Sequence, residues 1–378
     1  MSAVALAVDA VAPAHAAAQV PARVALLGTG TVGSALRTRL ASWTGTPLGA
    51  RLSLVHVANS RHAVSSRFGI AADATEVLLA HHSYPSTLSA VVPALAGDGP
   101  RIVIDATASE EVAAQHAQWL AQGIHVVTAC KLGQGTSLAR WRQIRAGCRD
   151  GGVHYGDSAT VGAGLPLLRS IRELQAGGDR IHAIAGVLSG SLAWLCNHFD
   201  GLRPFSGFVR EARAAGYTEP DPREDLSGED VRRKLLILAR AAGVELDAGE
   251  VEVASLVPAS LAKLAKEEVD AALPLLDATL RERYAAAYKN GEKLRFIARL
   301  GPSGDGGVRA SVGLESLPSD HPLAGGAATD NRVAIWSDRY NAQPLVIQGP
   351  GAGAEITAAA LLDDVLAIQS RGDQARGN

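Results

Sequence analysis

The stretch VALLGTGTVGSALRTRLASW, residues 24–43, indicates the fold class of this chain. Its apolar start is typical of a buried strand, its glycines of a tight turn, and its remainder of a helix. Gly28, Gly30 and Gly33 form G-x-G-x-x-G, in which the glycines permit the turn, let the backbone approach a pyrophosphate, and let helix and strand pack closely. A plain glycine turn is the alternative. We predict a dinucleotide site whose turn residues are Gly28, Thr29, Gly30, Thr31, Val32 and Gly33.

The alternation of strand and helix continues along the chain. Strand patterns occur at 52–60 (LSLVHVANS), 101–109 (RIVIDATAS) and 125–131 (HVVTACK), and residues 110–123 have the pattern of an amphipathic helix. Strands that alternate with helices form a parallel sheet covered on both faces. We therefore predict an α/β fold whose first domain is a Rossmann-type, doubly wound parallel sheet that ends near residue 155.

The rest of the chain has a different pattern. Longer helical stretches at 165–175 and 230–243 alternate with glycine-rich connections, and SGDGG at 303–307 predicts a hairpin turn. This mixture indicates an α+β substrate domain. We expect a disordered leader at 1–20, a nucleotide-binding domain at 21–155, a catalytic domain at 156–340, and a C-terminal segment at 341–378 that returns to the nucleotide-binding domain.

Composition excludes several classes of protein. The 378 residues are 47% hydrophobic, and the net charge of −2 with scattered basic residues gives no attraction to nucleic acid or acidic lipid. No apolar run reaches the ~18 residues of a membrane span. No Lys or Arg precedes the small-residue stretch APAHAAA, so a signal peptide is not expected. Three widely spaced cysteines favour a reducing compartment, and we expect the cytoplasm.

The second strand pattern carries information about the cofactor. NAD sites usually place a carboxylate at its end to bind the ribose 2′-hydroxyl, but here the residues are Asn59, Ser60 and Arg61. NADP is therefore favoured, with NAD as the alternative and Arg61 as a solvated loop residue if it has no role. At the end of the third strand, Thr107 and Ser109 either line the nicotinamide side of the cleft or cap the next helix.

The segment GYTEPDPREDLSGEDVRRK, residues 216–234, precedes a strongly helical pattern. Ser227 with Asp230 fits an N-cap box. The apolar stripe of the predicted helix is Val231, Leu235, Leu238 and Ala242, with Arg232, Arg233 and Arg240 on the opposite face. Asp230 and Lys234 share one shoulder of the stripe, so we expect a partly buried lysine beside a carboxylate. Such a lysine is a candidate for proton transfer, because burial lowers its pKa towards working pH.

Seven segments together resemble the homoserine dehydrogenase family, in order and at suitable spacing from about residue 23 to residue 366. They are GTGTVG, VANS, HVVTACK, ATVGAGLPLL, GVLSGSL, GYTEPDPREDLSGEDVRRKLLILAR and VIQGPGAGAEITAAALLDDVL. The chain is most similar to the dehydrogenase part of bifunctional aspartokinase/homoserine dehydrogenases. Because its length leaves no room for a kinase domain, we expect a stand-alone form.

The resemblance implies reversible reduction of L-aspartate 4-semialdehyde to L-homoserine with NAD(P)H, a step in threonine, methionine and isoleucine biosynthesis. It implies Lys234 as the proton donor, Lys131 as a second active-site lysine beside the nicotinamide, and Glu219 and Asp230 as ligands of the substrate's amino group. It also places Gly216 and Gly353 at the cofactor. A homodimer is expected, with the second domain, 156–340, providing dimerisation as well as catalysis.

Two positions depart from the family pattern. The family has Asn where this chain has Cys130, which is either a packing substitute or an oxidation-sensitive thiol. The family also binds a structural sodium ion through carbonyls that correspond to Val161, Ala163 and Leu165. Its acidic ligand corresponds to Ser158, with Asp157 one residue away. The sequence therefore leaves two alternatives, a retained and a lost cation site.

Two other functions remain to be weighed. One is aspartate-semialdehyde dehydrogenase, with Cys130 as an acylating nucleophile beside Lys131. The other is a non-catalytic protein that senses NADP(H) with the same fold. The first would leave the carboxylate–lysine segment without a role, and the second would not need a lysine beside two acids in its cleft.

Overall fold

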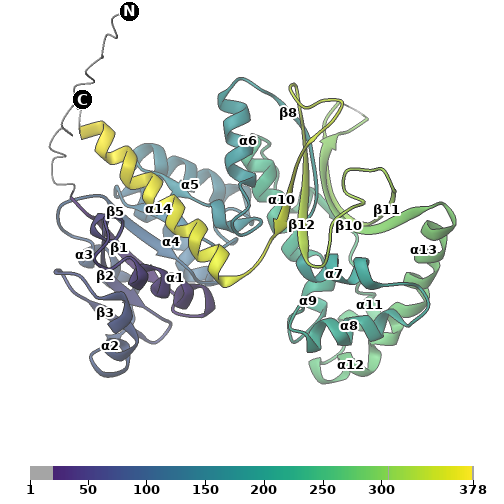
Figure 1. The fold of residues 1–378 in the computed structure, drawn as a ribbon, viewed down its shortest axis with the longest axis horizontal. Helices are drawn as coiled ribbons and strands as arrows, with labels where there is room; N and C mark the ends of the chain where they lie inside the picture. Colours follow the sequence, from purple (N-terminus) through teal and green to yellow (C-terminus); the bar gives the residue numbers. More distant parts are fainter. Residues whose placement is uncertain (1–19, 305, 377–378) are drawn as a thin grey trace, which may run out of the picture.

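The computed structural model describes residues 20–304 and 306–376, which fold around two β-sheets (Figure 1). The leader expected at 1–20 lies almost entirely outside the described residues. The first sheet has the order β4-β3-β2-β1-β5-β6-β7, with β2, β1, β5, β6 and β7 parallel. Its strands are β1 Ala22–Leu27, β2 Leu52–Ala58, β3 His62–Ser65, β4 Tyr84–Pro85, β5 Arg101–Asp105, β6 His125–Thr128 and β7 Tyr155–Gly156. The predicted Rossmann-type sheet is confirmed.

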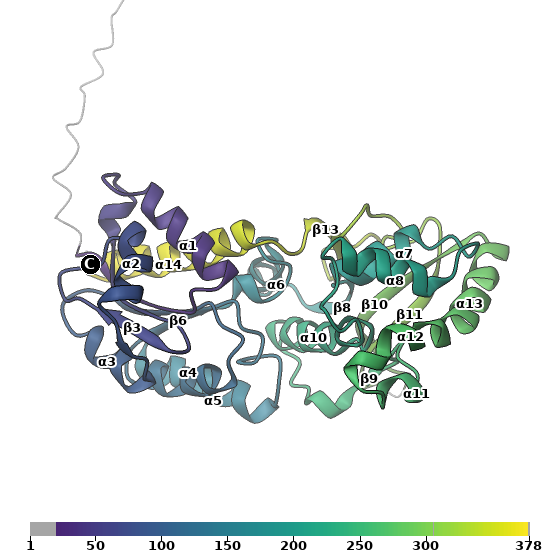
Figure 2. The ribbon, with the colours of Figure 1, turned by 90° about the horizontal axis from the view of Figure 1, so that it is seen from below.

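Helices cover both faces of this sheet. They are α1 Thr31–Ser42, α2 Thr75–His81, α3 Val91–Ala94, α4 Glu110–Ala121, α5 Leu138–Gly151 and the C-terminal α14 Ala354–Arg376. Helix α14 lies beside α1 in both views (Figures 1 and 2). Its buried residues Leu361, Leu362 and Val365 belong to the same hydrophobic cluster as Leu36 and Ile104. The end of the chain is therefore part of the first core.

The second sheet has the order β13-β12-β8-β10-β11-β9 and is antiparallel except for the β11–β9 pair. Its strands are β8 Ile181–Val187, β9 Val251–Val253, β10 Glu292–Pro302, β11 Val308–Pro318, β12 Asp330–Ser337 and β13 Leu345–Pro350. Pro302 pairs with Val308, which confirms the predicted hairpin around 303–307, although residue 305 is outside the described part. Since β13 still pairs with β12, the chain leaves this sheet only after Pro350; the domain limits stay a prediction.

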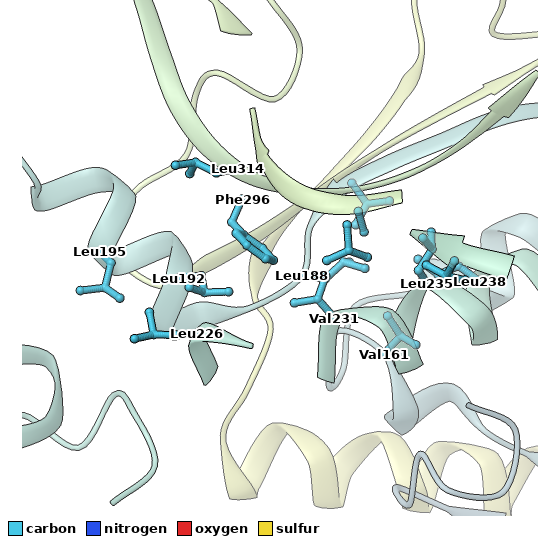
Figure 3. Packing of buried hydrophobic residues seen from close by; sticks show 14 of the residues in the cluster. Val161, Leu188, Leu192, Leu195, Leu226, Val231, Leu235, Leu238, Phe296 and Leu314 are labelled. Carbon is cyan, nitrogen blue, oxygen red and sulfur yellow. The ribbon is translucent and has the colours of Figure 1, made fainter. Parts of the chain in front are cut away.

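The helices of the second unit pack largely on one face of its sheet. They are α6 Leu167–Ala176, α7 Gly190–His198, α8 Phe205–Ala214, α9 Arg223–Leu226, α10 Glu229–Ala241, α11 Ala259–Ala262, α12 Val269–Ala272 and α13 Asp277–Lys289. Figure 3 shows their core, where Phe296 of β10 lies among leucines and valines of several elements. Among the described residues no helix is long and apolar enough to cross a membrane.

Helix α10 is more deeply buried than its sequence indicates. It lies between the two units (Figure 2) and is covered on nearly all sides from Lys234 to Arg240. The prediction that Arg240 takes an exposed face is wrong, because its guanidinium donates hydrogen bonds to the carbonyls of Gln134, Thr136 and Leu246. Burial lowers the pKa of Arg240 to about 10. The arginine thereby ties α10 to the loop that follows Lys131.

Candidate active site

A cleft of about 830 Å³ lies between the two units, beside the carboxyl ends of the parallel strands. This is where ligands bind in open α/β sheets. The first unit and the start of α14 line it with Thr31, Val32, Thr107, Lys131 and Gly353, and the second unit lines it with Ser189, Glu219, Asp225, Asp230 and Lys234. The residues expected to act on a substrate are therefore brought together from distant parts of the chain.

Lys234 of α10 is the buried cation of this cleft, with 9% of its surface exposed. Its Nζ donates a hydrogen bond to the carbonyl of Leu188, 2.7 Å away, and lies 2.9 Å from Oδ2 of Asp230. Burial lowers the pKa of Lys234, and the charge of Asp230 opposes this shift. The expected pair of a partly desolvated lysine and a carboxylate four residues away is present.

Asp230 also contacts a lysine of the other unit. Lys131 Nζ lies 3.4 Å from Oδ1 of Asp230, while Lys234 takes the second oxygen. Burial opposes ionisation of Asp230, but Lys234 and then Lys131 hold the pKa of its carboxyl well below the usual range. The carboxylate stays ionised and sets two ammonium groups side by side, which can donate to one substrate oxygen.

Glu219 reaches the cleft on a loop fixed by Asp225. Asp225 accepts hydrogen bonds from the backbone N–H of Glu219 at 2.8 Å and from the hydroxyl of Ser191 at 2.7 Å. Glu219 itself is exposed, so its carboxylate is free to meet a cation. Five carboxylates of the second unit line the cleft: Glu219, Glu224, Asp225, Glu229 and Asp230.

The predicted cap of α10 is wrong by one residue. The N-cap is Gly228, at φ +79°, and its neighbour Ser227 donates to the carbonyl of Glu224 and accepts from the N–H of Glu229. The apparent box of Ser227 with Asp230 does not form, because the Asp230 carboxylate binds the two lysines instead. The acid is therefore a site residue rather than a capping residue.

The glycine turn fits a dinucleotide phosphate. Gly28 needs its φ of +96°, and a Cβ on Gly33 would lie 2.0 Å from the carbonyl oxygen of Gly28. A Cβ on Gly30 would meet nothing within 4 Å, so packing does not explain this glycine. Gly30 is also the N-cap of α1, with no side-chain cap and no acid in the first turn. Free N–H groups and open space are what a phosphate needs here.

Comparison with known proteins decides the family. The family model described as homoserine dehydrogenase matches residues 166–366, and the one described as its NAD-binding domain matches residues 28–156. The chain belongs to the homoserine dehydrogenase family. This is a family of NAD(P)-dependent oxidoreductases, and neither rival function accounts for both matches.

Relatives within the family agree. The homoserine dehydrogenase of Schizosaccharomyces pombe is 34% identical, over 92% of this chain and 95% of the yeast protein. A bifunctional aspartokinase/homoserine dehydrogenase of Zea mays is 37% identical over 92% of this chain, which spans only 38% of the maize protein. A crystal structure of a Candida auris protein of unknown function superposes with a TM-score of 0.85 at 33% identity, covering 93% and 99% of the two chains.

Other residues predicted for a homoserine dehydrogenase site lie at varying distances from the cleft. Thr107 lines it, whereas the hydroxyl of Ser109 accepts from the N–H of Val112 and caps α4. Asn59, Ser60 and Arg61 form the turn between β2 and β3, where Asn59 accepts from the N–H groups of Arg61 and His62. Gly216 ends α8 at φ +74° and does not line the cleft.

Cys130 is packed rather than presented to the cleft. It is 3% exposed, and desolvation, followed by the charge of Asp105, raises the pKa of its thiol to about 12. A thiol with this pKa is protonated at neutral pH and is a poor nucleophile. The Cys130 thiol is therefore unsuited to be the nucleophile that an aspartate-semialdehyde dehydrogenase would need.

The loop expected to bind sodium is well formed, but its nearest acid is already paired. Ala163 has φ +51°, and both oxygens of Asp157 accept from Arg172, at 2.7 and 2.6 Å. Ser158 is hydrogen-bonded to Asp364. Among the described residues no group of three or more His, Cys, Asp and Glu forms a metal cluster. A sodium site at the carbonyls of Val161, Ala163 and Leu165 therefore stays a prediction.

Sequence reasoning missed Asp225 and two serines, Ser189, which is the N-cap of α7, and Ser191 in the first turn of that helix. Asp225 lies in the acidic stretch before the predicted helix, and its carboxylate organises the Glu219 loop. Ser189 lines the cleft and lies 2.9 Å from Ser191, the donor to Asp225. The only local signal was the GVLSGSL segment, and nothing in its spacing indicates a contact with residues 34 positions away.

Proposed function

We propose that the protein is a homoserine dehydrogenase that interconverts L-homoserine and L-aspartate 4-semialdehyde. The observation that carries the proposal is the buried Lys234, paired with Asp230 and adjacent to Lys131, in a cleft that also borders the glycine turn. NAD(P), when bound, supplies or accepts the hydride at C4 of the nicotinamide. The protein must then bind the amino acid, hold its reacting carbon near that position, and move one proton.

Lys234 performs the proton transfer in this proposal. In the reductive direction its ammonium donates a proton to the aldehyde oxygen, and in the oxidative direction the neutral amine accepts the hydroxyl proton. The bond to the Leu188 carbonyl and the ion pair with Asp230 fix the position of Nζ. Lys131 donates to the same oxygen and stabilises negative charge as it develops. The ion pairs with Asp230 hold both ammonium groups in position.

The carboxylates of the cleft bind the substrate's ammonium group. Glu219 is exposed and pairs with no lysine in the described part of the chain, while Asp230 keeps free acceptor positions beyond its two lysine contacts. Gly353 and Val32 border the same space on the cofactor side. An amino acid can therefore lie with its amino end towards Glu219 and its side-chain oxygen towards Lys234.

We further propose NADP as the preferred cofactor. The β2–β3 turn presents Arg61, and no ion pair among the described residues engages its guanidinium. No carboxylate stands at the end of β2 to repel a 2′-phosphate or to bind a free 2′-hydroxyl. Arg61→Ala should lower kcat/KM with NADP more than with NAD; equal effects on both cofactors would contradict the role of Arg61.

A homodimer and a reducing compartment complete the proposal. On β12, Val333 and Ile335 face the helices, whereas Ala334 and half-buried Trp336 face the other way into a small cluster with Val346. Most of this cluster is buried within the chain, and its partly buried members Trp336 and Val346 are where we propose that a second copy of the chain makes contact. The three cysteines are free thiols, as in proteins of the cytoplasm.

The direct test of function is a spectrophotometric assay. Purified protein with L-homoserine and NADP should form NADPH without added phosphate, and the absorbance of NADPH follows the reaction. Phosphate-dependent oxidation of aspartate semialdehyde that is abolished by Cys130→Ser would support the aspartate-semialdehyde dehydrogenase instead. Cofactor binding with no turnover of either substrate would support the NADP(H) sensor.

A further inference from the structure

Beneath the cleft lies a buried polar cluster that the proposed reaction does not use directly. Asp105, the last residue of β5, His116 of α4 and Thr128, the last residue of β6, are all 0% exposed. Tyr155 of β7 completes it, with its hydroxyl 2.9 Å from His116 Nδ1. Burying such groups costs several kcal/mol unless every one is hydrogen-bonded. An apolar core at this position would avoid that cost.

Asp105 is the centre of the cluster. Its Oδ1 accepts from the N–H and the hydroxyl of Thr107, at 2.9 and 2.6 Å. Its Oδ2 lies 3.0 Å from His116 Nε2 and 3.1 Å from the hydroxyl of Thr128. A carboxylate has about four acceptor positions, and four donors surround this one. The Asp105 carboxylate therefore fixes the backbone after β5 and the end of β6 relative to each other.

Both strand ends continue directly into the cleft. Thr107 lines it on one side, and on the other Thr128 accepts from the N–H of Cys130, the residue before Lys131. The loop after Lys131 also rests on the cluster, since a Cβ on Gly133 would lie 2.3 Å from the Tyr155 hydroxyl oxygen. The side-chain hydrogen bonds that leave the cluster thus end at Thr107 and at Cys130, the residue before Lys131.

We propose that Asp105, His116, Thr128 and Tyr155, here called the Asp105 network, position Lys131 and Thr107 for the reaction. These are positioning residues: none of them lines the cleft. Their function is to keep the Lys131 ammonium at its place beside Asp230 while cofactor and substrate come and go. The inference rests on the proposed function, because it assigns the network to the same chemical step.

The test uses Tyr155→Phe, which removes one hydroxyl and little volume. The readouts are the single-turnover rate of NADPH formation from homoserine, the dissociation constant for NADP and the melting temperature. We expect the rate to fall about tenfold, because small displacements of reacting groups cost one to two orders of magnitude. The dissociation constant should stay within about twofold, since the glycine turn is untouched.

A second background separates positioning from general stability. In Lys131→Ala, Tyr155→Phe should change the rate less than about twofold, because residues that act as a unit are not additive. The matched control is Tyr84→Phe, which removes a hydroxyl 2.6 Å from Ser65 at the far edge of the sheet and should leave the rate unchanged. If Tyr155→Phe does not fold, Thr128→Val should show the loss and Thr128→Ser should restore the rate.

The outcomes are distinct. A tenfold loss that vanishes without Lys131 supports the network. A loss of the same size in both backgrounds, or a lower melting temperature with a normal rate, overturns it and leaves the dehydrogenase assignment intact. A folded wild-type protein that does not oxidise homoserine overturns the proposed function, and the inference with it.

Discussion

At the scale of the single residue, the position of Lys234 predicts a particular pH dependence. Homoserine oxidation needs the neutral amine, so kcat/KM should rise with pH through the pKa of Lys234, at a midpoint below the usual lysine value because burial lowers that pKa. Asp230 opposes the shift, so Asp230→Asn should move the midpoint to still lower pH. Weaker substrate binding would change only the height of the profile. A midpoint that stays in place or rises would contradict proton transfer by Lys234.

Cys130 predicts a second result at this scale. Its thiol is buried and has a pKa raised to about 12, so it should resist iodoacetamide in the folded protein at neutral pH and react after unfolding. Cys130→Ser should keep homoserine oxidation within a few-fold of wild type, because the residue does not line the cleft. Rapid inactivation by alkylation of Cys130 would instead indicate a thiol that takes part in catalysis.

At the scale of the element, the glycine turn separates folding from cofactor binding. Gly30→Ala should unfold at the wild-type temperature, since Gly30 has φ −69° and its Cβ would meet no protein atom, yet it should weaken NADP binding about tenfold or more. Gly33→Ala should lower the unfolding free energy by about 3 kcal/mol or more, because its Cβ would overlap the Gly28 carbonyl. Differential scanning fluorimetry and a binding titration compare the two. Normal NADP affinity in Gly30→Ala would contradict the proposed phosphate site.

Helix α14 gives another prediction at this scale. Leu362 is fully buried in the first core, so Leu362→Ala should lower the unfolding free energy of the nucleotide-binding unit by about 2–5 kcal/mol. Leu366→Ala, on the same helix but only partly buried, is the control and should cost less. Chemical denaturation of both variants checks this. Equal losses would mean that α14 does not complete the core.

Some helices and strands could be predicted from the sequence and others could not. Strands β1, β2, β5 and β6 and helix α4 are predictable because apolar runs and caps are local signals. The failures concern α10. Periodicity shows that one face is buried, but it does not show that a second unit covers the opposite face, so Arg240 was placed in solvent. Ser227 matched a capping pattern whose acid binds lysines brought close by the fold.

At the scale of the whole molecule, the site exists only because two units meet. Lys131 comes from the first unit and Asp230 from the second, and their 3.4 Å contact crosses the cleft. Motif resemblance could identify both residues, but not the network beneath Lys131, because Asp105, His116 and Tyr155 come together through the sheet and α4. Long-range partners of this kind have no signal in local spacing.

The partly buried residues Trp336 and Val346 of the second sheet make a prediction about assembly. The protein should sediment as a dimer, and Trp336→Asp, which places a charge beside the partly buried Val346, should shift it towards the monomer. Sedimentation velocity of wild type and variant measures this. A monomeric wild-type protein would contradict the proposed dimer without affecting the assignment of the cleft.

We propose that a buried lysine, in a cleft between two units, transfers the proton of a dehydrogenase reaction. Lys234→Ala removes this lysine, and NADP affinity and homoserine turnover are then measured on the same folded sample. NADP should bind as in wild type, because Lys234 belongs to the substrate side of the cleft, and turnover should fall by about 10²- to 10⁴-fold. Turnover near the wild-type rate would contradict the claim.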